Sequence, residues 1–168
     1  MAATPCRYPV LKRAFLFSCL TGLRKSDIQK LTWGEVQKFG KYTRIVFKQR
    51  KTKGQEYLDI SSQAEKYLGE RGNPDDIVFT GFTYGSWTSL ELQRWSLAAG
   101  VNKNLTFHCA RHTFAVLMLD LGADIYTVSN LLGHRFLTTP QTYAKVLAKN
   151  KPNPVPLLPD IGEPTKRR

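Results

Sequence analysis

The chain has 168 residues, of which 42% are hydrophobic and 23% are charged, so it suits one domain with a packed core and excludes intrinsic disorder. Its formal net charge is +12, and residues 1–60 hold thirteen basic and four acidic residues, against twelve and nine in the other 108. Such concentrated positive charge favours a polyanionic partner, because each neutralised phosphate releases bound counterions, although an ordinary basic soluble protein has the same balance.

Two further classes of protein are excluded by the sequence. The longest apolar stretch, residues 14–20, is too short to cross a membrane, and no signal peptide is visible. The three cysteines, Cys6, Cys19 and Cys109, are widely spaced and form no C-x-x-C pair. A disulfide framework and a zinc knuckle are therefore not expected, and a reduced, cytoplasmic compartment fits best.

The first part of the chain is predicted to form two helices and a hairpin. An apolar segment at 10–20 predicts a helix that stops at Gly22, and a short second helix follows at 26–31. Residues 42–47 and 56–60 have strand composition. Between them, Lys51-Thr52-Lys53-Gly54 is typical of a turn, so the two strands are expected to be antiparallel.

The rest of the chain is predicted to be mainly helical. Ser61 and Ser62 cap a helix that runs to about residue 70, a short extended piece follows at 77–79, and residues 86–99 form the next helix. Three more helices are expected at 107–121, 124–132 and from Pro140 to about residue 149. The fold class is therefore mainly α with a small antiparallel β-sheet.

The predicted helix at 107–121 places charged groups beside an apolar face. That face consists of Phe107, Ala110, Phe114, Leu117, Met118 and Leu121. Arg111 lies about 40° from Phe107 around the helix, and an arginine beside a core is costly unless an anion or a carboxylate meets it. His108 lies three positions before Arg111, so the two can share one ligand. A structural salt bridge of Arg111 is the alternative.

His108 and His112 have the i, i+4 spacing that can also bind a metal ion. The sequence lacks the glutamate of an H-E-x-x-H motif, and no third ligand stands nearby. Metal-dependent phosphoryl transfer would also need clustered carboxylates, which this basic chain does not offer. We therefore expect no metal and no other cofactor, and His112 could equally be a hydrogen-bonded packing residue.

Two glycine turns carry polar residues out of apolar helices. Thr21-Gly22-Leu23-Arg24 ends the first helix, and Leu131-Leu132-Gly133-His134 ends a later one. Either turn alone is an ordinary helix C-cap. Nine residues after His134 comes Tyr143, which alone would be interpreted as a packing residue.

Taken together, these motifs in this order resemble the tyrosine recombinase (phage integrase) family, particularly integrases of bacterial mobile or conjugative elements. The resemblance runs from about Lys12 to Ala148 and implies the fold of that family's catalytic domain. All six positions of the family's catalytic set have a counterpart here: Arg24, Lys51, His108, Arg111, His134 and Tyr143. Asp27 matches the acidic residue that often supports the first arginine, and His112 completes the H-x-x-R-H motif.

The resemblance implies a role for each of these residues. Arg24 and Arg111 would bind the non-bridging oxygens of a DNA phosphate, and Tyr143 would attack the phosphorus to form a 3′-phosphotyrosine. His108 would assist as a base, and His134 would hydrogen-bond the developing oxyanion. A hairpin lysine would protonate the departing 5′ oxygen. Because the phosphotyrosine conserves the bond energy, a new 5′-hydroxyl can rejoin the strand without metal or ATP.

The hairpin offers three candidates for the catalytic lysine, because turns shift between relatives. Lys51 matches the Lys-Thr pattern of related integrases, and Lys48 and Lys53 are its neighbours. Basic residues beside the catalytic set are expected to contact double-stranded DNA. These are Lys25, Lys48, Arg50, Lys53 and Arg135.

The resemblance also sets expectations for domains and assembly. Residues 1–149 would form the catalytic domain, and 150–168 would form a Pro-rich basic C-terminal tail. Members of the family usually carry a helical DNA-clamping domain before the catalytic domain, and the abrupt start of this sequence predicts that this core-binding domain is absent. The full-length protein would act as a homotetramer on paired sites, and the isolated domain would be a monomer.

Two rival interpretations are open. A type IB topoisomerase-like enzyme would use the same covalent intermediate to relax DNA. The Leu-Gly-His motif and the small size of the chain favour a recombinase. A basic helical DNA-binding module would explain the charge and the helices, but it would not need His134 and Tyr143 at this spacing. Formation of a covalent DNA adduct separates the second rival from both enzymes.

Overall fold

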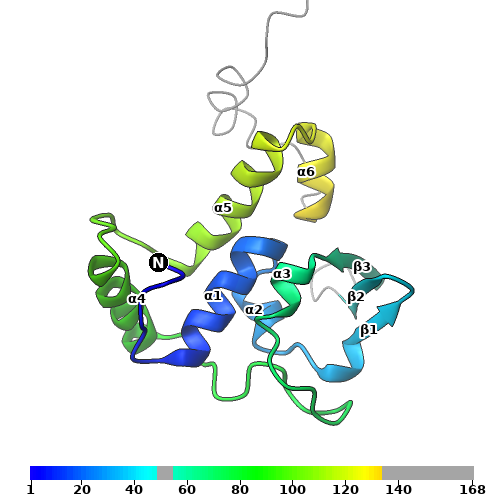
Figure 1. Ribbon diagram of the computed structural model, residues 1–168, viewed down its shortest axis with the longest axis horizontal. Coiled ribbons are helices and arrows are strands. Elements are labelled where there is room, and N and C mark those ends of the chain that lie inside the picture. The colour runs from blue at the N-terminus through cyan, green and yellow to red at the C-terminus, as the bar shows by residue number, and fades with distance from the viewer. Residues whose placement is uncertain (49–54, 134–168) are drawn as a thin grey trace, which may run out of the picture.

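The computed structural model describes residues 1–48 and 55–133 (Figure 1). Helix α1, Pro9–Thr21, lies in the middle, with α5, Phe107–Asp120, packed against it and a small sheet on its other side. Leu11, Ala14 and Phe17 of α1 have no exposed surface. This helix begins with Pro9 at its first position and ends at Gly22, whose φ of 69° suits a residue without a Cβ. The helix predicted at 10–20 is therefore confirmed.

The sheet has three antiparallel strands in the order β1-β2-β3: Val36–Phe39, Tyr42–Lys48 and Gln55–Ile60. Ile45 in the central strand pairs with Val36 on one side and Leu58 on the other, and all three side chains are buried. The predicted antiparallel pairing of these two strands is confirmed, and the turn predicted at 51–54 lies outside the described residues. Strand β1 was missed. Only its first residue is buried, so the strand lacks the alternation by which sequence reveals a strand, and pairing with β2 holds it in place.

Short elements connect α1 and the sheet to the helical half. They are α2, Lys25–Ile28; the 3₁₀ turn η1, Trp33–Glu35; and α3, Ser62–Glu65. Ser61 caps α3 as predicted, since its hydroxyl accepts a hydrogen bond from the Ala64 N–H. The prediction that this helix runs to residue 70 was wrong. Beyond the end of α3, the Arg13 side chain of α1 donates hydrogen bonds to the carbonyls of Tyr67 and Leu68, which hold this segment against α1.

The later helices that the structure describes agree closely with their predicted bounds, and the helix predicted from Pro140 to about residue 149 lies outside the described residues. Helix α4 spans Ser86–Ala98, and α6 spans Ile125–Leu131 with Asp124 as its N-cap. The predicted apolar face of α5 is partly wrong, because Leu117 and Leu121 are 43% and 82% exposed. The buried side turns instead through Ala115 and Leu119, which pack with Val128 of α6. The mainly α fold with a small antiparallel sheet is confirmed.

The structure also describes the three cysteines and the lengths of the helices. All three cysteines fall within the described residues and are free thiols. Burial raises the pKa of Cys19 to about 12. Among the helices of residues 1–48 and 55–133, none is both long and apolar enough to cross a membrane.

Candidate functional site

Arg24 stands at the end of a tightly held turn between α1 and α2. The Ser18 hydroxyl, fully buried, donates to the Leu23 carbonyl at 2.8 Å, and the Gly22 N–H donates to the Ser18 carbonyl at 2.9 Å. Arg24 is the N-cap of α2 and is half-buried. Within the part of the chain that the structure describes, its guanidinium has no hydrogen-bond or ion-pair partner. A half-buried cation in this state is suited to an anionic ligand.

Arg111 is held much more firmly. It is 6% exposed, its Nη1 donates to the Gly22 carbonyl at 2.6 Å, and its Nη2 donates to the Leu132 carbonyl. An arginine this buried was expected to meet an anion or a carboxylate, and here backbone carbonyls, which carry partial negative charge, meet it as well. These two bonds fix the plane of the guanidinium against the turn before Arg24 and the end of α6.

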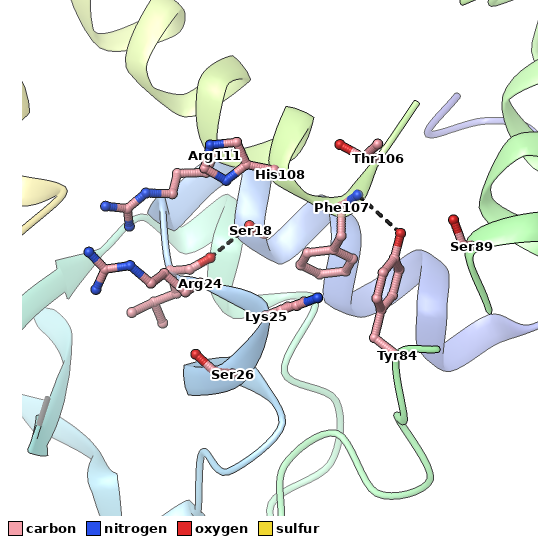
Figure 2. Close-up of a pocket in the computed structure, with 11 residues that line it drawn as sticks. Ser18, Arg24, Lys25, Ser26, Tyr84, Ser89, Thr106, Phe107, His108 and Arg111 are labelled. Carbon is pink, nitrogen blue, oxygen red and sulfur yellow. Dashed lines mark hydrogen bonds between the residues drawn. The ribbon is translucent and has the colours of Figure 1, made fainter. Parts of the chain in front are cut away.

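The two guanidinium groups lie beside each other and point the same way (Figure 2). Both line a cavity of about 390 Å³ and a second one of about 220 Å³. The larger cavity extends along the starts of α2 and α5, where His108 stands at its rim. The smaller cavity is bounded by the Gly22 turn, the sheet and the end of α6. Two like charges this close favour a shared anion between them.

His108 lines the larger cavity beside the two arginines. Partial burial, then the charges of His112, Arg111 and Arg24, lower its pKa from the ordinary 6.5. The ring is therefore neutral near neutral pH and able to accept a proton. His112 packs edge-on against it, with 4.5 Å between ring centroids. Among residues 1–48 and 55–133, no group of three His, Cys, Asp or Glu side chains could hold a metal ion.

Tyr84 is a cavity residue that sequence analysis missed. Its hydroxyl accepts a hydrogen bond from the Phe107 N–H at 3.2 Å, and the Lys25 ammonium lies 4.9 Å from its ring centroid (Figure 2). Tyr84 falls between the predicted extended piece at 77–79 and the helix at 86–99, in a segment with no motif. Nothing in the sequence signalled that this loop reaches the start of α5.

Of the other predicted site residues, some line the two cavities, and the side chains of the rest lie outside the described part of the chain. Asp27 lines the smaller cavity with Arg24. Its backbone N–H donates to the Arg24 carbonyl, but no ion pair joins the two side chains in the described region. Lys25 lines the larger cavity. Lys48 ends β2, and its side chain is outside the described part. The following predicted residues lie outside the described residues altogether: Arg50, Lys51, Lys53, His134, Arg135 and Tyr143.

The sequence of the chain is similar to those of known tyrosine recombinases. The chain is 32% identical over 140 residues to tyrosine recombinase XerD of Oceanobacillus iheyensis, covering 75% of this chain and 46% of the relative. It is 33% identical over 134 residues to tyrosine recombinase XerC of Actinobacillus pleuropneumoniae, covering 73% and 43%. The chain thus spans less than half the length of these curated relatives.

Solved structures show the same fold. The catalytic domain of bacteriophage HP1 integrase matches with a TM-score of 0.58 and 26% identity, over 84% of this chain and 77% of that one. The XerA recombinase matches with a TM-score of 0.61 and 20% identity, over 88% and 64%. The described fold is therefore that of a tyrosine recombinase catalytic domain.

A match to a protein-family model agrees with the sequence motifs, the paired arginines and this fold. The model of the phage integrase family matches residues 2–150, nearly the whole chain. The chain belongs to the phage integrase family.

Proposed function

We propose that this chain is the DNA-breaking and rejoining domain of a site-specific tyrosine recombinase or integrase. The observation that carries the proposal is the pairing of Arg24 and Arg111 at the wall of one cavity, with neutral His108 at its rim. A phosphodiester between the guanidinium groups would have its charge offset on two oxygens. An uncharged imidazole beside it can take the proton of an attacking hydroxyl.

In the proposed reaction Tyr143 is the nucleophile. Its oxygen attacks phosphorus, the bond to the 5′ oxygen of the next nucleotide breaks, and a 3′-phosphotyrosine forms. His108 accepts the tyrosine proton, Lys51 gives a proton to the departing oxygen, and His134 donates to a phosphate oxygen. Asp27 supports the first arginine through its backbone N–H, which donates to the Arg24 carbonyl, and His112 supports His108 through ring packing. Attack by a different 5′-hydroxyl reverses these steps and exchanges the strands, so neither metal nor ATP is needed.

The proposed partner is double-stranded DNA in the bacterial cytoplasm. Net charge and the concentration of basic residues in 1–60 support it. Among the structural relatives, XerH is described bound to its difH substrate, and the Tn1549 integrase in complex with circular intermediate DNA. We assign the backbone contacts to Lys25, Lys48, Arg50, Lys53 and Arg135. Residues 1–149 form the catalytic domain, 150–168 the tail, and the full-length protein acts as a homotetramer while this domain alone is a monomer.

The test is capture of DNA on Tyr143. A pool of duplexes of varied sequence carries a nick a few bases 3′ of each candidate phosphate, so that the short 5′-hydroxyl fragment diffuses away after cleavage. In the presence of chelator, wild type is expected to form a denaturation-resistant adduct that maps to Tyr143, and Tyr143→Phe is expected to form none. Tyr126→Phe is the matched control, because Tyr126 is an exposed tyrosine of α6 that lines neither cavity.

Each other result would contradict part of the proposal. An adduct that persists in Tyr143→Phe would show that another residue is the nucleophile. Cleavage that requires a divalent metal and leaves no protein on the DNA would indicate a nuclease. DNA binding without any adduct, in this chain and in a longer form of the protein, would indicate a non-catalytic DNA-binding module.

A further inference from the structure

We propose that Tyr84 is a positioning residue that holds the starts of α2 and α5 together and so sets the distance between Arg24 and His108. This inference rests on the proposed function, because it concerns the same anion site. Tyr84 belongs to neither helix. It precedes α4 and reaches the larger cavity from the side opposite the arginines (Figure 2).

The contact with α5 is made at the first residue of the helix. Phe107 is the first helical residue, so its N–H has no partner within the helix. The Tyr84 hydroxyl accepts this N–H at 3.2 Å, and the Tyr84 and Phe107 rings pack edge to face, 5.3 Å between centroids. His108 is the next residue. A bond at Phe107 therefore fixes the first turn from which the imidazole projects.

The contact with α2 is made by the same ring. Lys25, the first residue of α2, places its ammonium 4.9 Å from the Tyr84 ring centroid, within the range of a cation–π interaction. Arg24 immediately precedes it as the N-cap. The Tyr84 side chain thus restrains Lys25, which follows Arg24, and Phe107, which precedes His108. The two helices that it links are far apart in the sequence.

The rest of the structure indicates why such a link is needed. Arg111 is locked by two carbonyls, whereas Arg24 is half-buried without a described partner and His108 stands at the cavity rim. The Ser18 and Gly22 hydrogen bonds hold the backbone before Arg24, and the residue after it and the residue before His108 need a hold of their own. Tyr84 supplies a hold on both. Its loss would misplace the groups around the phosphate while leaving the core of α1 and the sheet intact.

The chain offers a matched pair of variants. Tyr84→Phe removes only the hydroxyl and keeps the ring beneath Lys25. Tyr8→Phe also removes a half-buried tyrosine hydroxyl that bonds to the backbone, because the Tyr8 hydroxyl donates to the Gly81 carbonyl outside both cavities. A general loss of packing would affect the two variants alike, and a positioning role would affect only Tyr84→Phe.

The experiment measures adduct formation on the nicked duplexes, DNA affinity by fluorescence anisotropy, and the ring signals of His108 by NMR across pH. Tyr84→Phe is expected to slow adduct formation at saturating DNA about five- to tenfold, on the scale of one hydrogen bond. It should leave the half-saturating DNA concentration within about twofold, and it should shift the His108 ring signals. Tyr8→Phe should change none of these. Tyr84→Leu, which also removes the ring, should slow the reaction further and weaken DNA binding through Lys25.

Two results would overturn the inference: His108 signals unchanged in Tyr84→Phe, or equal slowing in Tyr84→Phe and Tyr8→Phe. The NMR measurement needs no catalysis. If wild type forms no adduct, the proposed recombinase function fails, and the His108 signals in the two variants still decide whether Tyr84 positions this site.

Discussion

The described residues form two hydrophobic clusters of unequal size, and the arginine site lies where they meet. The larger cluster has twenty-one buried residues from α1, the sheet, α4 and the start of α5. The smaller has five: Phe114, Ala115, Leu119, Val128 and Leu132. A cluster of five residues buries little apolar surface, and hydrophobic stabilisation scales with that surface. Among the described residues, α6 and the end of α5 are therefore expected to be less stable than the rest.

The site takes its rigid parts from both clusters. Gly22 ends α1, and a Cβ placed on it would lie 2.6 Å from Cδ1 of Phe114 and 2.9 Å from Cδ2 of Leu132. Arg111 donates to the carbonyls of Gly22 and Leu132. Helix α5 runs through both clusters, and beside it the Gly22 turn and the buried Arg111 guanidinium join them. Arg111 therefore has a structural task that Arg24 does not share.

Replacing each arginine by alanine separates those tasks and should give the largest effects. Both Arg24→Ala and Arg111→Ala are expected to slow adduct formation by about two to three orders of magnitude, the scale of losing one anion-stabilising donor. Only Arg111→Ala should also lower the free energy of unfolding, by about 1–3 kcal/mol, because buried carbonyls lose their donor. Urea denaturation beside single-turnover kinetics measures both. Equal destabilisation by the two substitutions would refute the assigned difference.

Truncating one leucine in each cluster tests their unequal stability. Leu11→Ala and Leu119→Ala both remove buried side chains. Each is expected to lower the free energy of unfolding by about 2–5 kcal/mol, with the smaller loss where neighbouring side chains can fill the space. In Leu119→Ala, amide hydrogen exchange should accelerate in α6 and the end of α5 while α1 keeps its protection. In Leu11→Ala, exchange should accelerate throughout. Acceleration of α1 in both variants would show that the clusters unfold as one unit.

The smallest effect is expected from pH. Because partial burial and the charges of His112, Arg111 and Arg24 lower the His108 pKa, the folded chain binds fewer protons here than the unfolded chain. This contribution leaves stability intact above the ordinary value of 6.5 and reduces it as pH falls through the lowered native pKa. His108→Gln should therefore flatten the loss of melting temperature between about pH 7 and about pH 5. An identical pH dependence in wild type and variant would contradict this origin.

The helices and the site differ in how far the sequence predicts them. Helices α1, α4, α5 and α6 were found because apolar periodicity and caps are local signals. Strand β1 was missed because it is held by its neighbour and not by its own pattern. The family motifs singled out Arg24, His108 and Arg111, and the structure brings these three proposed site residues to one cavity.

What local signals could not provide was the set of partners. The sequence placed Arg111 beside a core, but its carbonyl partners come from Gly22 and Leu132, 89 and 21 residues away along the chain. Tyr84 lies 23 residues before its partner Phe107. Such contacts depend on tertiary packing, which periodicity and spacing do not encode. The outward turn of Leu117 and Leu121 has the same cause, since α6 covers only one side of α5.

The bond from Arg111 to the Leu132 carbonyl has a consequence for binding. In the proposed function a phosphate would bind this guanidinium in the position that its bond to Leu132 holds, so the two equilibria would be thermodynamically coupled. Coupling of this kind is reciprocal: any change that loosens the end of α6 must weaken phosphate binding by the same factor by which phosphate tightens α6. Occupancy of the anion site and order in the smaller cluster should therefore report on each other.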